Sequence, residues 1–340
     1  MVQFYAQVPR QRRPTLYAMQ SFGRRQRPRR LRPLRPLRPL AMVAVVVASA
    51  LLATAAFVTH RLWPLTDRAA GAIDAPGLTA PSGGGPGAAP KVELVAGAPA
   101  GHQKHVPARA AIVVDRTTGR VLWQKGAHRP LPIASLTKLM TALVAADRKP
   151  GGAFVVTPAM TGVPGYTLGL KAGDRVTERR MLAAALIASA NDAANALAVH
   201  RSGSIARFVR RMNAEARTLG LHDTHYSNPS GIFDTANNSS AWDQATISLR
   251  VLEQPLLRRM VGSKSYTASP TASYVSRNTL LWDYRGAIGI KTGQTTAAGN
   301  CIAAAARRKD RSIVVVLLHV DGDEFGTAAR LLDWGFRHAG

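Results

Sequence analysis

The sequence predicts a mixed α/β (α+β) fold, in which one sheet joins the two ends of a domain and a largely helical insertion lies between them. Two β-rich runs occur early, within residues 109–125, and three more return after residue 286. The long stretch between them shows mainly helical periodicity. Strands at both ends with helices in the middle indicate a sheet built from distant parts of the chain.

The elements follow in order from local patterns. The runs AAIVVD and RVLWQKG flank RTTG, a turn signal, so the domain opens with a β-hairpin. Apolar residues then recur at helical spacing, most strongly over residues 135–147, 178–188, 192–200 and 204–219. Strand signals return in AIGIKT, CIAAAAR and SIVVVLLHV, and EFGTAARLLDWGF predicts a closing helix.

Residues 1–39 form an arginine-rich leader, and residues 40–59 are a candidate membrane helix. The leader holds eleven arginines and no acid, and its repeated Arg-Pro-Leu opposes a helix, so we expect it to be disordered. The next twenty residues carry no charge and are long enough to span a bilayer. The positive-inside rule then predicts a single-pass protein of the cell membrane with a cytoplasmic N-terminus. A cleaved signal peptide is the alternative.

Residues 60–106 are rich in Gly, Pro and Ala and predict a flexible linker, which leaves residues 107–340 as a folded extracytoplasmic domain. The net charge of +26 is spread over the leader and this domain. Such a leader attracts anionic lipids or nucleic acid, although we expect no nucleic-acid partner. The single cysteine, Cys301, lies in the apolar run CIAAAA, so we expect it in the core.

The segment IASLTKLMTALVAAD, residues 133–147, places a serine and a lysine at the start of a helix. Lys138 follows Ser135 by three residues, so the two side chains lie on one face, a turn apart. A serine hydroxyl is a good nucleophile only when a base removes its proton. Lys138 can be that base if burial and a second cation lower the pKa of its amine. The first helical turn also directs backbone N–H groups toward a negative charge at Ser135.

A second polar triplet, Ser189-Ala190-Asn191, interrupts two apolar helices. One interpretation is a helix break in which Ser189 or Asn191 caps the following helix. The other gives Ser189 the role of relaying a proton to a leaving amine, and Asn191 that of holding a substrate backbone. The triplet alone does not decide between them.

A third triplet, Lys291-Thr292-Gly293, stands at the end of a strand run. Lys291 and Thr292 can bind a carboxylate, and Lys291 can be the cation that lowers the pKa of Lys138. Gly293 permits the close approach of a ligand to the backbone. The order of the three motifs along the chain favours one shared site.

With these motifs, residues 107–340 resemble the low-molecular-weight penicillin-binding proteins, the serine-type D-alanyl-D-alanine carboxypeptidases of peptidase family S11. The segments that carry the resemblance include DTHYSNPSGIFD, NTLLWDYRGAIGIKTGQTTAAGNC and the terminal LLDWGF. The resemblance implies the penicilloyl-serine-transferase (β-lactamase/DD-peptidase-like) fold, an antiparallel sheet flanked by helices plus a mostly helical subdomain. We expect a monomer without a metal or other cofactor.

The resemblance also implies the reaction. Ser135 would be acylated by the penultimate D-Ala carbonyl of a peptidoglycan stem peptide, which releases the last D-Ala. Lys138 would be the base, Ser189 the proton relay and Asn191 a substrate clamp. Water would then hydrolyse the acyl-enzyme, whereas β-lactams would imitate the substrate and stay attached.

The same resemblance implies that the third triplet binds the C-terminal end of the substrate. Lys291 and Thr292 would bind the terminal carboxylate, with Gly293 beside them, and the backbone N–H groups of Ser135 and Gln294 would form the oxyanion hole. Two features depart from the family. Relatives often carry a basic residue shortly before the last helix, where this chain has DGDEFG. We also expect no C-terminal anchor after RHAG, so the N-terminal helix would be the tether.

The sequence also bears on other classes of protein. A class A β-lactamase needs a Glu-x-x-Leu-Asn run between Asn191 and Lys291, and a Ser-His-Asp hydrolase needs a Gly-x-Ser-x-Gly elbow; the sequence has neither. His222 and His225 have metal-like spacing without a third ligand, so we expect loop structure there. A D,D-endopeptidase that uses the same residues, and a non-catalytic binder of anionic wall polymers, stay open.

Overall fold

The computed structural model of the protein describes residues 94–96, 105–232, 235–269 and 272–339. The expected leader, the apolar run and nearly all of the expected linker lie outside these residues, so their assignments stay predictions. Within the described part of the chain, no helix is long and apolar enough to cross a membrane.

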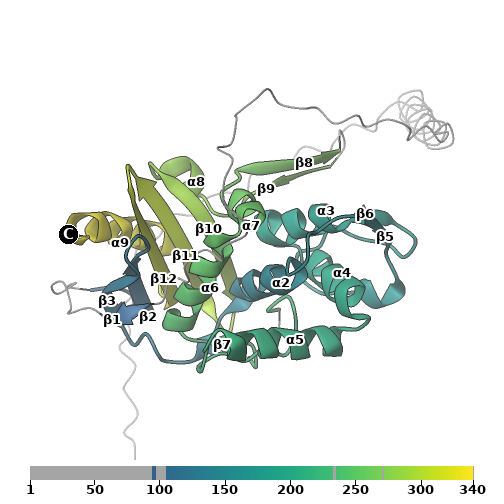
Figure 1. The fold of residues 1–340 in the computed structure, drawn as a ribbon, viewed down its shortest axis with the longest axis horizontal. Coiled ribbons are helices and arrows are strands. Elements are labelled where there is room, and N and C mark those ends of the chain that lie inside the picture. The colour runs from purple at the N-terminus through teal and green to yellow at the C-terminus, as the bar shows by residue number, and fades with distance from the viewer. Residues whose placement is uncertain (1–93, 97–104, 233–234, 270–271, 340) are drawn as a thin grey trace, which may run out of the picture. The chain divides into compact units, whose positions relative to one another are not determined.

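A six-stranded sheet organises the fold, with the strand order β1-β3-β2-β12-β11-β10 (Figure 1). All neighbouring strands are antiparallel except β1 and β3, which are parallel. The predicted joining of the chain's early and late strands is therefore confirmed, because β2 pairs directly with β12. The strands of this sheet are β1 (Val95–Ala96), β2 (Ala108–Asp115), β3 (Arg120–Lys125), β10 (Ala287–Thr295), β11 (Gly299–Arg308) and β12 (Arg311–Val320).

The short strand β1 lies inside the stretch expected to be a linker. Its Val95 stands opposite Arg120 of β3, and the Val95 N–H donates to the Gly119 carbonyl oxygen at 3.0 Å. A β-branched residue after Leu94 gives these few residues a strand preference that the surrounding Gly, Pro and Ala lack.

Both faces of the sheet are covered by helices, which explains why its central strands are apolar throughout. Successive residues of a strand point to opposite faces. Val113 and Val315 belong to the cluster that packs under α9, and Ile112 and Val316 to the cluster on the side of α2 and α6. Cys301 is fully buried, as predicted.

The helical subdomain stands beside the sheet (Figure 1), and the apolar side chains of α2 to α5 continue the hydrophobic cluster that covers one face of the sheet. Three of the four predicted helices agree with it closely, and the first begins later, because residues 134–136 form a separate 3-10 turn. The helices are α2 (Thr137–Ala145), α3 (Glu178–Ala183), α4 (Asn191–Ser202), α5 (Ile205–Thr218), α6 (Ala241–Glu253), α7 (Pro255–Val261), α8 (Leu280–Asp283) and α9 (Glu324–His338). The shorter helical segments are η1 (Ala134–Leu136), η2 (Pro158–Met160) and the π-helical η3 (Ala184–Ala188).

Three two-stranded sheets complete the described fold: β4 (Leu131–Pro132) with β7 (Asn238–Ser239), β5 (Ala153–Val155) with β6 (Arg175–Thr177), and β8 (Ser265–Ser269) with β9 (Ala272–Val275). The patterns that predict the other elements did not reveal β8, β9, α6 or α7. The backbone of His225 pairs with Asn238 in an antiparallel bridge, in line with the loop structure expected there.

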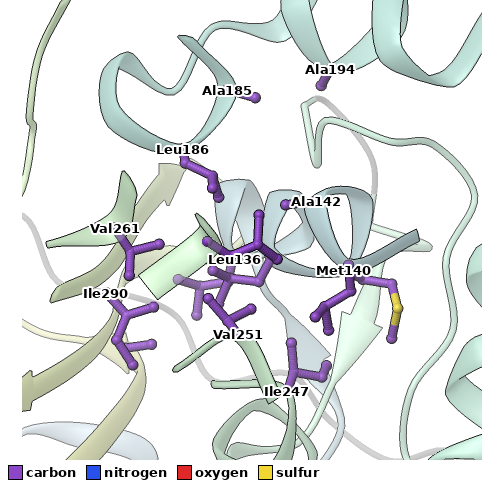
Figure 2. Close-up of a cluster of buried hydrophobic side chains, with 14 of the residues drawn as sticks. Leu136, Met140, Ala142, Ala185, Leu186, Ala194, Ile247, Val251, Val261 and Ile290 are labelled. Carbon is purple, nitrogen blue, oxygen red and sulfur yellow. The ribbon is translucent and has the colours of Figure 1, made fainter. Parts of the chain in front are cut away.

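Hydrophobic packing fixes the start of α2 against the sheet. Leu136, directly after Ser135, is fully buried, and Figure 2 shows it in one cluster with Val251 of α6 and Ile290 of β10. Full burial of such a side chain stabilises the fold by about 2 kcal/mol. The packing therefore holds Ser135 at the junction of the sheet and the helical subdomain.

Candidate active site

Ser135 lies in a tight turn that the surrounding chain holds in place. The preceding residue, Ala134, has a φ of +46°, in the left-handed region that non-glycine residues rarely occupy. Gly231, with a φ of +77°, packs against this turn so closely that a Cβ atom there would overlap the Ala134 carbonyl oxygen. Strain of this kind persists only where the surroundings impose it, and it clusters at functional sites.

The side chain of Lys138 reaches back along α2 to Ser135. Its Nζ lies 2.8 Å from Ser135 Oγ, 2.8 Å from Asn191 Oδ1 and 2.7 Å from the Ser230 carbonyl oxygen. A neutral amine has two hydrogens and one lone pair. If the hydrogens are donated to Asn191 and Ser230, the lone pair faces the Ser135 hydroxyl, as a general base requires.

The side chain of Asn191 forms hydrogen bonds within the site and does not cap a helix. Its Nδ2 donates to the Pro164 carbonyl oxygen at 2.8 Å, while its Oδ1 accepts from Lys138. The capping interpretation of this triplet is therefore not what the structure shows, since α4 has no side-chain hydrogen bond at its N-cap. Asn191 orients the amine of Lys138 instead.

Ser189 and Lys291 meet on the other side of the cleft. Ser189 ends the π-helical segment with a φ of +65°, and its Oγ accepts a hydrogen bond from Lys291 Nζ at 2.9 Å. Lys291 also donates to the Thr292 carbonyl oxygen at 2.9 Å. The structure thus brings the second and third triplets together across 102 residues of sequence.

Burial and neighbouring cations control the charges of both lysines. Lys138 is fully buried, and burial, then the charge of Lys291, then that of Arg277, lower its pKa well below the usual range. Burial and Arg277 lower the pKa of Lys291 to about 7. The neutral form of Lys138 is therefore favoured while Lys291 carries its charge. The sequence predicted the same two causes, burial and a second cation, for a lowered pKa of Lys138.

Gly293 brings the third triplet against the Ser135 turn. A Cβ atom at this position would lie 2.8 Å from the Ser135 backbone nitrogen and 3.1 Å from Ala134 Cβ. Because the glycine has no side chain, β10 passes directly beside the turn. Thr292 and Gln294, on either side of Gly293, both line the cleft in front of Ser135.

The cleft has a volume of about 360 Å³ and contains residues that sequence reasoning did not assign to the site. Arg277 lines it, with its guanidinium carbon 5.4 Å from the centroid of the Tyr166 ring, in a cation–π arrangement. Glu324 and Phe325, at the start of α9, also line the cleft. No motif marked Arg277, because it reaches the site through tertiary packing.

A larger hollow of about 470 Å³ lies elsewhere, between α2, α5 and α6. It holds none of the motif residues, and its charges pair within it: Arg211 with Asp147 at 2.6 Å and Arg250 with Glu253 at 2.8 Å. The motif residues therefore identify the smaller cleft as the candidate active site. Within the described residues, no group of three His, Cys, Asp or Glu side chains is placed to hold a metal ion.

Comparison with known proteins agrees with this geometry. The family model for peptidase S11, described as D-alanyl-D-alanine carboxypeptidase, matches residues 98–322. The chain belongs to this family. The resemblance stated from the sequence motifs is therefore confirmed.

Relatives in the family include carboxypeptidases and endopeptidases. D-alanyl-D-alanine carboxypeptidase DacB2 of Mycobacterium tuberculosis is 36% identical, over 68% of this chain and 82% of the relative. The D-alanyl-D-alanine endopeptidase of Escherichia coli is 31% identical, over 72% of this chain and 82% of that protein. D-alanyl-D-alanine carboxypeptidase DacF of Bacillus subtilis is 31% identical over 67% of this chain. The chain covers 62% of the length of that relative.

Solved structures confirm the predicted fold. A crystal structure of a D-alanyl-D-alanine carboxypeptidase from Mycobacterium tuberculosis superposes with a TM-score of 0.67 at 34% identity, over 70% of this chain and 95% of that one. A Streptomyces DD-transpeptidase gives a TM-score of 0.66 at 28% identity, over 69% of this chain and 99% of that one. The S11 chain described here thus has the DD-peptidase fold, with a sheet flanked by helices.

Proposed function

We propose that this protein is a serine-type D-Ala-D-Ala carboxypeptidase that trims the terminal D-Ala from peptidoglycan stem peptides. One observation carries the proposal: Lys138 Nζ lies 2.8 Å from Ser135 Oγ, at the base of a cleft that also contains the Ser189–Lys291 pair. Membership of the S11 family supports the reaction class. β-Lactams would acylate the same serine.

Acylation begins with a proton transfer from Ser135 Oγ to the neutral Nζ of Lys138. The oxygen then bonds to the carbonyl carbon of the penultimate D-Ala, and the carbonyl oxygen becomes negatively charged. The backbone N–H groups of Ser135 and Gln294 stabilise that charge, which is supported by the contact of β10 with the Ser135 turn at Gly293.

Collapse of the tetrahedral intermediate breaks the peptide bond and leaves an ester on Ser135. The proton that Lys138 accepted passes through Ser189, whose Oγ is held by Lys291 at 2.9 Å, to the departing D-Ala nitrogen, which leaves Lys138 neutral. Water then attacks the ester, and Lys138 accepts its proton. As the acyl–oxygen bond breaks, Lys138 returns that proton to Ser135 Oγ, and the shortened peptide leaves as its carboxylic acid. Proton and bond changes balance, so the cycle needs no cofactor.

Cations around the cleft would bind the substrate's terminal carboxylate. Thr292 and Arg277 line the cleft, and Lys291 donates a hydrogen bond to Ser189, which also lines it. Arg277 compensates for the acidic DGDEFG segment at the start of α9, where a basic residue was expected from relatives. A guanidinium can hold a carboxylate through two parallel hydrogen bonds.

The test measures D-alanine release and covalent labelling by a fluorescent penicillin. We expect the wild type to release D-alanine from a peptide ending in D-Ala-D-Ala and to become labelled. Ser135→Ala should lose both, while Ser273→Ala, an exposed serine of β9, should keep both. Covalent labelling of the Ser135→Ala protein would refute the assignment of the nucleophile, and a wild type that stays unlabelled would favour a non-catalytic binder.

The endopeptidase alternative has its own support, because two kinds of relative share the family. A cross-linked muropeptide offered beside a linear pentapeptide separates them. Faster release of D-alanine from the linear peptide supports the carboxypeptidase, and faster cleavage of the cross-link supports the endopeptidase.

We also propose that a single N-terminal helix, residues 40–59, anchors the protein in the cell membrane, with the leader in the cytoplasm and the domain from residue 107 outside. The uncharged apolar run and the arginines before it support this location. A monomer is proposed because the hydrogen bonds of Lys138 to Ser135 and Asn191, and of Lys291 to Ser189, form within a single chain. The mass of the mature protein would reveal cleavage after the apolar run, which would contradict the anchor.

A further inference from the structure

Basic side chains gather where several turns meet at one end of the central sheet. The Arg116 N–H donates to the Ser312 carbonyl oxygen at 2.8 Å, and the Arg307 N–H to that of Gly286 at 2.8 Å, which joins the β2–β3 turn, the β11–β12 turn and the start of β10. The surface they form is called the basic end. It comprises Arg116, Arg285, Arg307, Lys309, Arg311 and Arg337.

The charge of the basic end is only partly compensated. None of its six side chains forms an ion pair with an acid among the described residues. Of the nearby acids, Asp333 is paired with Arg308 at 2.7 Å, Glu253 is paired with Arg250 at 2.8 Å, and Asp115 is buried. Asp283 and Asp310 are the exposed ones, so a positive surplus faces solvent.

Like charges at the basic end lie close to one another. Burial and then the charge of Arg258 lower the pKa of Arg116; Glu253 opposes this shift, and the charge of Arg307 adds a smaller lowering. Placing cations side by side costs free energy unless an anion binds them. The arrangement therefore favours a partner with closely spaced negative charges.

An exposed tryptophan borders the basic end. Trp282 of α8 is 45% exposed, and Lys264 Nζ lies 5.9 Å from the centroid of its ring. α8 packs against β10, which begins at this end. Tryptophan beside basic residues is typical of surfaces that contact lipid headgroups, since the indole ring is amphipathic. A soluble polyanion would use the arginines and leave the apolar ring in water.

The chain's path also points to a membrane. Val95 is paired with the β2–β3 turn region through the Gly119 carbonyl oxygen, so the described residues nearest in sequence to the apolar run lie at the basic end. The cleft lies at the opposite end of α9. Phe325, in the first turn of α9, lines the cleft, whereas the carbonyl oxygen of His338, its last residue, accepts from Arg120 Nη2 at 3.4 Å. A helix of 15 residues is about 22 Å long.

We propose that the basic end docks on anionic phospholipid headgroups, with Trp282 at headgroup level, and so holds the cleft facing away from the membrane. The inference rests on the proposed membrane location. Tethering raises the local concentration of the domain at the bilayer, so even a weak surface interaction is populated. Such docking weakens at high salt, because exposed charges are screened.

The experiment uses the full chain in lipid vesicles, with an environment-sensitive fluorophore on an introduced cysteine. Thr118→Cys places the probe in the exposed β2–β3 turn, and Ala297→Cys places it in the β10–β11 turn at the cleft end. The native Cys301 is buried and does not compete for the label. Vesicles of phosphatidylcholine are compared with vesicles that also contain phosphatidylglycerol.

We expect the emission of the Thr118 probe to shift to the blue only when phosphatidylglycerol is present, and to revert at high salt. The Ala297 probe should not respond. Replacing Arg307, Lys309 and Arg311 by glutamine should abolish the shift, whereas replacing Arg207, Arg210 and Arg217 on α5 should leave it unchanged. Penicillin labelling verifies that both triple variants are folded.

Three results would overturn the proposal: no shift of the Thr118 probe, equal shifts of both probes, or a shift produced by a soluble glycerol-phosphate polymer but not by vesicles. The last would identify a wall polymer as the partner. A wrong anchor assignment is separately visible, because the chain would then fail to sediment with vesicles of phosphatidylcholine alone.

Discussion

Gly293 of β10 packs directly against Ser135 of the 3-10 turn η1: a Cβ atom at Gly293 would lie 2.8 Å from the Ser135 backbone nitrogen. Gly293→Ala should therefore push β10 away from the turn and distort the oxyanion site. A misplacement of about 1 Å costs roughly 100-fold in rate. The acylation rate with penicillin measures this, and overpacking should lower stability by about 1–3 kcal/mol. A variant that acylates at the wild-type rate would show that β10 does not help to form the oxyanion site.

The pH dependence of acylation should be bell-shaped and should respond to Arg277. The rate rises as Lys138 loses its proton, and it falls as Lys291, whose pKa is lowered to about 7, becomes neutral. Arg277→Gln removes a cation that lowers the pKa of both lysines, so both limbs should move to higher pH. Arg277→Lys keeps the charge and serves as the control. Acylation rates across the pH range test this, and limbs that stay fixed in Arg277→Gln would contradict it.

Replacement of Asn191 should separate the effects of charge and hydrogen bonding on Lys138. Asn191→Asp places a carboxylate beside Nζ, which raises the pKa of the amine and keeps it protonated at neutral pH. Loss of the general base should slow acylation by about 100-fold or more. The rate should recover in part at higher pH, whereas Asn191→Ala should show no such recovery. Identical pH profiles for the two variants would assign the effect to geometry alone.

Two glycines with nearly equal φ angles offer a matched test of the Ser135 turn. Gly231 and Gly169 have φ of +77° and +74°, but a Cβ atom at Gly231 would overlap Ala134, whereas Gly169 has open space around it. Alanine at either position carries a backbone strain of about 1–2 kcal/mol. Gly231→Ala should also displace the turn and slow acylation strongly, while Gly169→Ala should only lower the free energy of unfolding. Thermal unfolding and acylation rates distinguish the two, and equal acylation rates would contradict the role of Gly231.

Local chemistry made much of the site predictable. The spacing of Ser135 and Lys138 determines a one-turn contact whatever the rest of the fold does, and the sequence order of the triplets suggested a common cleft. The closing strands were visible because a sheet covered on both faces needs continuous apolar runs such as SIVVVLLHV. The Cys301 prediction holds for the same reason.

The remaining features depend on tertiary packing. Arg277 and the Ser230 carbonyl oxygen act on Lys138 from loops without a motif, and a backbone carbonyl leaves no mark in the residue type. Helix α6 was missed although Ser240 caps it by accepting from the Asp243 N–H, a signal that capping rules can detect. Strands β8 and β9 are short and half exposed, so their hydrophobic pattern is weak.

The pairing of β2 with β12 has a consequence for synthesis. The strand that carries Lys291 leaves the ribosome long after the serine, and the sheet is complete only when β12 inserts between β2 and β11. On the proposed mechanism, a nascent or partly translocated chain thus has a serine of ordinary reactivity. Covalent labelling of Ser135 by a β-lactam would then show that the last strands have docked. The time at which labelling begins would measure when the enzyme matures.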